Sequence, residues 1–186
     1  MFLMKPGSIE LRTVVKERLI PHIHSRGFQL DAREIHKHDP YGHLMRRFLR
    51  WDGNRLELLD IQFDKHGRAK FVFNLGVAPP EGVDDYLGHH SQLETDISNI
   101  LKHGRLYAGN PYFMRWFSIP LLRIPLIRSP SAEDIVQHAI QLFPQAEAWL
   151  RDGTVGPNIR VQMGIAGTSA KAEHTPISNF KRIHLE

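Results

Sequence analysis

The residues best suited to metal chemistry lie in a histidine-rich segment, His36-Lys37-His38-Asp39-Pro40-Tyr41-Gly42-His43. Histidines at positions i and i+2 of a strand point to the same side, so His36 and His38 form the start of a candidate zinc or nickel site. Imidazole and carboxylate ligands suit both ions, and His43 or Asp39 would complete the set from the following turn. The alternative is a polar loop, because the spacing matches no closed zinc motif and the chain has 12 histidines.

A basic and aromatic run, Arg46-Arg47-Phe48-Leu49-Arg50-Trp51, suggests contact with nucleic acid. Aromatic rings on a strand can stack on bases while arginines meet phosphates, which makes an RNA-binding module one hypothesis. Its residues would be Arg46, Arg47, Arg50 and Phe48. The formal net charge of +4 is a weaker basic bias than most dedicated nucleic-acid binders show, so nucleic acid ranks below a protein as the expected partner.

Two further sets of residues are candidates for binding a partner. The first set is polar and is expected on one face of three neighbouring strands: Arg46, Arg50, Asp60, Gln62, Lys70 and Asn74. The second set is aromatic: Tyr112, Phe113, Trp116 and Phe117. Amide and charged groups can read a ligand's donors and acceptors, and aromatic residues are enriched at protein interfaces. The alternatives are a solvated, salt-bridged sheet surface for the first set and a second core layer for the other.

The sequence lacks the short motifs of catalysis and cofactor binding. It has no Gly-x-Ser-x-Gly elbow, no Gly-Lys-Ser/Thr phosphate loop and no complete dinucleotide fingerprint. With no cysteine, disulfides, thiolate metal sites and cysteine nucleophiles are excluded. We therefore expect a non-catalytic protein without a cofactor, while an acid–base site assembled from distant residues stays open.

Hydrophobic periodicity predicts the elements that position these residues. Ser8 to Ser25 has the apolar spacing of an amphipathic helix with Ser8 as its N-cap, and Gly27 would end it. The period changes to two between Phe28 and Val77, which predicts a three-stranded antiparallel meander with turns at Asp52-Gly53-Asn54 and His66-Gly67. The first helix is expected to cover its apolar face.

Alternation assigns the residues of the meander to two faces. We expect Met45, Leu49 and Trp51 on the apolar face, with Phe48 exposed among the arginines. A strand from Gln29 to Lys37 is a candidate addition to this sheet.

A second helix is expected from Ser131, which forms a capping box with Asp134, to Asp152-Gly153. Proline cannot donate the backbone hydrogen bond of a helix, so Pro21 should kink or shorten the first helix and Pro144 should kink or split the second.

These elements predict an α+β fold: an N-terminal helix packed on an antiparallel β-meander, with a second long helix and an irregular C-terminal segment. At about 150 residues per domain, residues 1–165 are expected to form a single α+β domain. Asn158 to Ile165 alternates and predicts a late strand. Residues 166–186 are expected to be a mobile or loosely packed tail, because they are poor in apolar residues until their end.

Several short motifs occur in a distinctive order: Gly27-Phe28 after the first helix, Arg47-Phe48 in one strand, Asp60-Ile61-Gln62 in the next, and Phe71-Val72-Phe73-Asn74-Leu75-Gly76-Val77 in the third. In these motifs the chain resembles domain-of-unknown-function family 4304, mainly over residues 8–80 and loosely beyond. The resemblance implies a small α+β domain of bacterial type and brings no catalytic residues with it. In outline such a domain is similar to immunity and antitoxin proteins, which act by binding; this is an analogy of fold.

We therefore expect a non-catalytic binding protein whose partner is another protein or a second copy of the chain. A histidine-based metal binder or metal-dependent enzyme is one alternative, and the RNA-binding module is the other. Met1–Pro6 lacks the ~7–15 apolar residues of a secretory signal. Trp116–Ile127, the most hydrophobic stretch, is shorter than the ~18 residues of a membrane span. A soluble, cytoplasmic protein that makes no membrane contact is expected.

Overall fold

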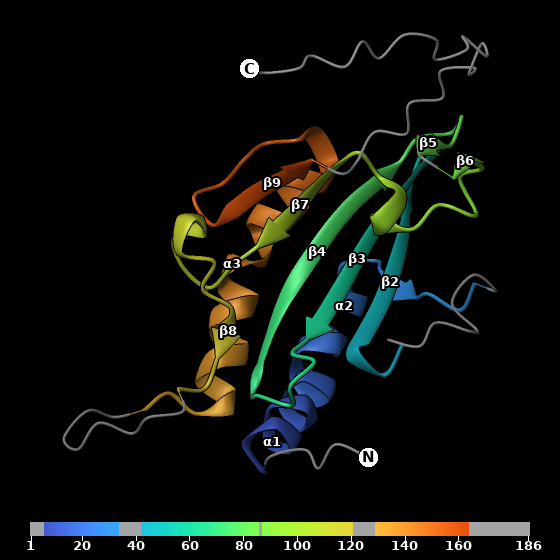
Figure 1. The fold of residues 1–186 in the computed structure, drawn as a ribbon. Helices are drawn as coiled ribbons and strands as arrows, with labels where there is room; N and C mark the ends of the chain where they lie inside the picture. The colour runs from blue at the N-terminus through green and yellow to red at the C-terminus, as the bar shows by residue number, and fades with distance from the viewer. Residues whose placement is uncertain (1–5, 34–41, 86, 121–128, 164–186) are drawn as a thin grey trace, which may run out of the picture.

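An antiparallel sheet can pack one face against helices and leave part of the other face to solvent. This chain does so, with a smaller core that covers one end of the second face. The computed structural model describes residues 6–33, 42–85, 87–120 and 129–163. In this part of the chain, the helices pack on one face of a seven-stranded antiparallel sheet (Figure 1). The α+β class predicted from the sequence is confirmed.

The N-terminal helix begins at Pro6 and runs without interruption to Ser25, with a π-helical turn at its centre. Its parts are α1 (Pro6–Val14), η1 (Val15–Leu19, π-helix) and α2 (Ile20–Ser25). Ser8 lies inside α1 and is buried, so its predicted role as N-cap is wrong. Pro21 lies in the first turn of α2, next to the π-helical turn, and does not end the helix. Gly27 follows the helix with φ 84°, a left-handed value that glycine adopts without strain.

Seven strands form the main sheet, in the order β1-β2-β3-β4-β7-β9, with β8 pairing beside β4. Their bounds are β1 (Gln29–Leu30), β2 (Met45–Asp52), β3 (Arg55–Phe63), β4 (Lys70–Ala78), β7 (Lys102–Leu106), β8 (Phe117–Ser118) and β9 (Ile159–Met163). The two predicted meander turns are confirmed, since Gly53 and Gly67 have φ values of 62° and 67°. The candidate strand from Gln29 to Lys37 is a strand only to Leu30, and residues 34–37 lie outside the described residues.

Short elements connect the strands at the sheet's edges. They are the hairpin of β5 (Val83–Asp85) and β6 (Gly88–His90), and the 3-10 helices η3 (Gly42–Leu44), η4 (Ile97–Asn99) and η5 (Pro111–Phe113). No helix among the described residues has both the length and the apolar character needed to cross a bilayer.

The second long helix, α3 (Ala132–Asp152), has the predicted capping box. The backbone N–H of Asp134 donates to Ser131 Oγ at 3.1 Å, and the Ser131 N–H donates to Asp134 Oδ2 at 2.9 Å. Pro144 does not split the helix. Its ring is exposed, so it cuts one hydrogen bond without opening the buried face of the helix.

The main core lies between the two helical segments and the sheet. The N-terminal helix contributes Leu11, Val15, Leu19 and Ile23, and α3 contributes Ala132, Val136, Ala139, Phe143, Ala146, Trp149 and Leu150. Gly104 on β7 lets Trp149 pack closely, because a Cβ at this position would lie 2.9 Å from the indole ring.

The predicted faces of β2 are wrong. Phe48 pairs with Leu59 and lies in the main core, whereas Trp51 is 49% exposed on the opposite face. The arginines beside Phe48 allow this arrangement, because a long side chain can cover apolar surface while its charged end reaches a partner. The Arg50 guanidinium, for example, lies 4.3 Å from the centre of the Phe28 ring.

A buried carboxylate ties the sheet to the end of α3. Glu57 pairs with Arg50 at 2.7 Å and with Arg55 at 3.4 Å, and its side chain is 1% exposed. Arg55 also donates to the backbone oxygens of Leu150 and Arg151, at 2.8 and 3.0 Å. Cations suit the C-terminal end of a helix, so this network fixes β2, β3 and α3 to one another.

A second, smaller core covers one end of the opposite sheet face. It consists of Leu56, Leu58, Ala78, Ile97 and Ile100. Gly76 on β4 permits this cover, since a Cβ there would lie 2.6 Å from Ile100 Cδ1. No helix of the described residues lies over the middle of that face (Figure 1).

We expect Gly104→Ala to destabilise the protein by about 1–3 kcal/mol, because the new methyl group must displace the Trp149 ring. Gly42→Ala is the matched control, since no atom lies within 4 Å of the added methyl group, and its effect should stay within about 0.5 kcal/mol. Urea unfolding measures both, and equal stabilities would contradict the close packing of Trp149.

We expect Glu57→Ala to cost about 3–5 kcal/mol, since it leaves two arginines without their buried partner. Glu133→Ala removes an exposed pair with Arg18 and should cost less than about 1 kcal/mol. The free energy of unfolding of each variant tests this contrast. A cost for Glu57→Ala as small as that for Glu133→Ala would show that the buried network contributes little.

Candidate ligand-binding cleft on the open sheet face

A row of polar side chains crosses the sheet on the face that the helices leave open. Strand pairing sets Arg47 opposite Asp60, and Asp60 opposite Asn74. It sets Asn74 opposite Arg105, and Arg105 opposite Arg160. Directly opposed residues of antiparallel strands share a face, so these five side chains form one polar row across β2, β3, β4, β7 and β9.

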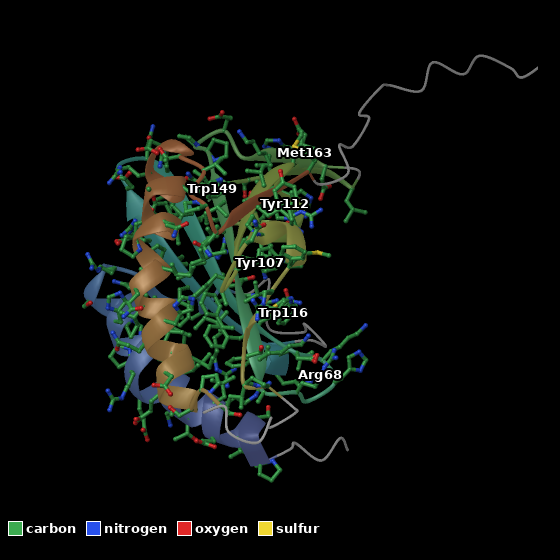
Figure 2. All side chains as sticks on the ribbon, turned by 90° about the vertical axis from the view of Figure 1, so that its left-hand side faces the viewer. Arg68, Tyr107, Tyr112, Trp116, Trp149 and Met163 are labelled. Atoms are coloured by element: carbon green, nitrogen blue, oxygen red, sulfur yellow. The ribbon has the colours of Figure 1, made fainter. Side chains whose placement is uncertain are left out.

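Four members of the polar row, all except Arg160, line a cleft of about 510 Å³. Its other lining residues come from β2, β3, β7 and the segment of η4: Met45, Gln62, Asp96, Ile97, Ser98 and His103. Seen along the sheet, the helices lie on one side with Trp149, and the open face looks the other way (Figure 2). We refer to this hollow as the cleft.

Hydrogen bonds hold Arg105 in a fixed position in the cleft. Its Nε donates to Asn74 Oδ1 at 2.7 Å, and its Nη2 donates to Gln62 Oε1 at 3.3 Å. Asn74 Nδ2 also donates to Gln62 Oε1, at 3.1 Å. Within the described residues, no carboxylate forms an ion pair with Arg105. The two amides therefore orient this guanidinium without neutralising its charge.

Asp60 is the buried carboxyl of the cleft, with 6% of the residue exposed. Burial raises the pKa of Asp60 well above its ordinary value, and the negative charges of Asp96 and Asp31 raise it further. The positive charges of Arg47 and Arg33 lower it by less. The environment of Asp60 thus favours the neutral carboxylic acid, which can donate a hydrogen bond as well as accept one.

The chain after β1 braces one wall of the cleft. Arg33 pairs with Asp31 at 2.7 Å and donates to the backbone oxygens of Thr95 and Leu93, at 2.8 and 3.1 Å. The N–H of Asp31 donates to the Arg47 carbonyl at 2.9 Å. These bonds fix the segment that carries Asp96 against the sheet.

His103 braces the opposite wall. Its Nδ1 lies 3.1 Å from the Ile100 carbonyl oxygen, and its Nε2 lies 3.1 Å from Gln162 Oε1. Both ring nitrogens are therefore engaged with protein groups. His103 positions β9 beside the cleft and does not present a free ring nitrogen to a ligand.

A second, more basic pocket of about 520 Å³ adjoins the cleft and shares Met45, Arg47 and Gln62 with it. Its charged or titratable lining residues are Arg47, Asp64, Lys65, His66, Arg68 and Lys70. Asp64 pairs with Arg68 at 2.8 Å. Lys70 Nζ lies 4.6 Å from the centre of the Trp116 ring, a cation–π contact. Arg68 and Trp116 are both on the side away from the helices (Figure 2).

The six-residue polar set predicted from the sequence is divided between the two faces. Asp60, Gln62 and Asn74 meet in the cleft, and Lys70 lies in the adjoining pocket. The prediction is wrong for Arg46 and Arg50, which lie on the same face as Phe48. The register of β2 and β3 places that face against the helices.

The predicted aromatic set is also divided. Tyr112 and Phe113 are 87% and 76% exposed on η5, and Trp116 is partly buried under Lys70. The prediction of an interface role is wrong for Phe117, which is fully buried and stacks on Phe71 with ring centres 5.1 Å apart.

Five lining residues of the cleft were not singled out in the sequence: Asp96, Ile97, Ser98, His103 and Arg105. The alternation of His103 and Arg105 around Gly104 was the available signal for a strand. That signal does not identify the strand that pairs with β7. The pairing of Arg105 with Asn74 of β4 is what places Arg105 in the cleft.

The predicted metal site lies mostly outside the described residues, because His36, His38 and Asp39 fall in the segment 34–41. His43 is exposed in η3, and its backbone oxygen accepts a hydrogen bond from Arg12 at 3.2 Å. Among the residues that the structure describes, no group of three His, Asp or Glu side chains is placed to hold a metal ion.

No family model matches the chain. No curated protein and no solved structure shows significant similarity to it either. The resemblance to domain-of-unknown-function family 4304 therefore stays a prediction, and the case for function depends on the geometry of the open face.

We expect Asp60→Asn to be more stable than the wild type, by a margin that grows with pH. An aspartic acid in the unfolded chain loses its proton at about pH 3.9. In the folded chain, the raised pKa of Asp60 means that its proton is kept to a higher pH. The unfolded state then binds fewer protons, so the stability of the wild type falls as the pH rises through this window.

Urea unfolding of both proteins from about pH 3 to 8 measures this margin. Asp84→Asn makes the same chemical change at an exposed position and is the control. A margin that shrinks as the pH rises would contradict the neutral state of Asp60.

Proposed function

We propose that this protein is a non-catalytic binding module that receives a protein partner on its open sheet face. The observation that carries the proposal is Arg105, a guanidinium that two amides orient and that forms no ion pair with a carboxylate of the described residues. A partly buried cation that merely stabilised the fold would be expected to have a counter-charge, as Arg50 has in Glu57. A guanidinium that is held in place but has no counter-charge is suited to binding an acceptor group of another molecule.

The composition of the open face favours a protein over RNA. Of the four residues of the RNA hypothesis, only Arg47 lies on this face, because Phe48, Arg46 and Arg50 lie on the opposite one. Lys70 occupies one face of the Trp116 ring, which reduces the surface on which a base could stack. The cleft also contains the acidic side chain of Asp96, which would oppose a run of phosphates.

Affinity capture from a lysate of the source cells tests the proposal. The bait is the tagged full chain, with and without nuclease, and the variant is Arg105→Gln. We expect a stoichiometric protein that survives nuclease and whose affinity falls about tenfold or more with Arg105→Gln, since hydrogen bonds to charged groups are worth about 1.5–3 kcal/mol.

Arg18→Gln is the matched control, because it removes the same charge on the helical side of the molecule, where Arg18 is 60% exposed. Equal capture by the wild type and both variants would contradict a role for the open face. A partner lost with nuclease would support the RNA hypothesis instead. Sedimentation equilibrium of the bait alone separates a second copy of the chain from a different partner.

A further inference from the structure

We infer that the group recognised in the cleft is a carboxylate, presented by an acidic segment of the protein partner and bound by Arg105 beside Asp60. This inference rests on the proposed function and names the chemistry of its ligand.

The first argument is the geometry of Arg105. Its guanidinium extends across β4, because its Nε meets Asn74 on β4 and its Nη2 reaches Gln62 on β3. Gln62 is two residues from Asp60 and on the same face, so the guanidinium and the Asp60 carboxyl line the same hollow. A guanidinium has five N–H donors, and those not used by the two amides remain for a planar, two-oxygen acceptor.

The raised pKa of Asp60 keeps its proton to a higher pH than that of an ordinary aspartic acid. A neutral carboxylic acid can donate its proton to a bound carboxylate in a short, strong O–H···O hydrogen bond. An ionised Asp60 would instead repel that carboxylate. The cleft is therefore matched to a carboxylate only while Asp60 keeps its proton.

The second argument concerns which anion the cleft suits. Asp96 accepts a hydrogen bond from the Ile97 N–H at 2.6 Å, which keeps a negative group on the rim. Doubling the charge of the ligand doubles both this repulsion and the attraction of Arg105, so charge alone does not distinguish a carboxylate from a phosphate dianion. A carboxylate is favoured because its two oxygens match the N–H donors that Arg105 has left and the proton of Asp60.

The charged and titratable groups that face Asp60 set the pH dependence. Asp96 and Asp31 favour its neutral form, and Arg47 and Arg33 favour its ionised form. Arg105 and His103 line the same cleft. As the pH rises and Asp60 ionises, carboxylate binding should weaken in the wild type.

The test uses a blocked peptide of alternating glutamate and glycine, the same peptide with glutamine in place of glutamate, and inorganic phosphate. Each is titrated into the isotope-labelled full chain, and NMR follows the side-chain Nε–H of Arg105. We expect saturable shifts with the glutamate peptide, none with the glutamine peptide, and at least tenfold weaker binding of phosphate. Arg105→Gln should weaken the glutamate peptide about tenfold or more, as followed at backbone amides of β7, and Arg18→Gln should leave it unchanged.

Asp60→Asn distinguishes a recognition role from a merely structural one. The amide keeps a hydrogen-bond donor and cannot ionise, so the variant should bind the peptide with an affinity that no longer falls as the pH rises. Equal binding of the two peptides, tighter binding of phosphate, or the same pH dependence in this variant would overturn the inference.

The two proposals fail in different ways. If capture depends on Arg105 but the protein does not respond to the glutamate peptide, the carboxylate inference is refuted and the protein-binding function stands. A response to the peptide, with capture that ignores Arg105, would keep the carboxylate site and remove the proposed function.

Discussion

The pairing of Phe48 with Leu59 fixes the face of every other side chain in β2 and β3, because side chains alternate along a strand with a period of two. With Phe48 in the main core, Arg47 must lie on the opposite face, across from Asp60. A shift of one residue would bring Trp51 into the core and expose Phe48. The core contact and the polar row are thus two consequences of a single register.

The open face remains open because its cover is short. The second core, with Ile97 and Ile100 seated on Gly76, closes one end of the face. Polar groups buried at the edge of this cover need partners, since an unsatisfied buried group costs free energy. Asn74 and Gln62 satisfy one another and Arg105, so the interior of the cleft is ordered before any ligand arrives. Such preorganisation lowers the entropic cost of binding.

Local signals in the sequence predicted the local parts of this fold. Ser131 with Asp134, and the glycines at 53 and 67, specify a helix start and two turns through contacts within a few residues. Local signals could not predict which face of β2 is buried, because an arginine stem can lie on an apolar face and a tryptophan can remain exposed. The cleft was predicted only in part, since Asp60, Gln62 and Asn74 belong to one hairpin, β3–β4, whose pairing is local. Arg105 reaches them through a strand pairing that spans 31 residues.

The position of β9 has a consequence for how the molecule assembles. This strand completes the outer side of β7, opposing Arg160 to Arg105, although more than fifty residues and the whole of α3 separate the two strands in the chain. Contacts between distant segments form late in folding, because closing a long loop carries an entropy cost that only the finished pairing offsets. During synthesis, the meander and the first helix can associate while β7 still has a bare edge. The outer edge of β7, beside the cleft, is therefore among the last parts of the described sheet to be paired.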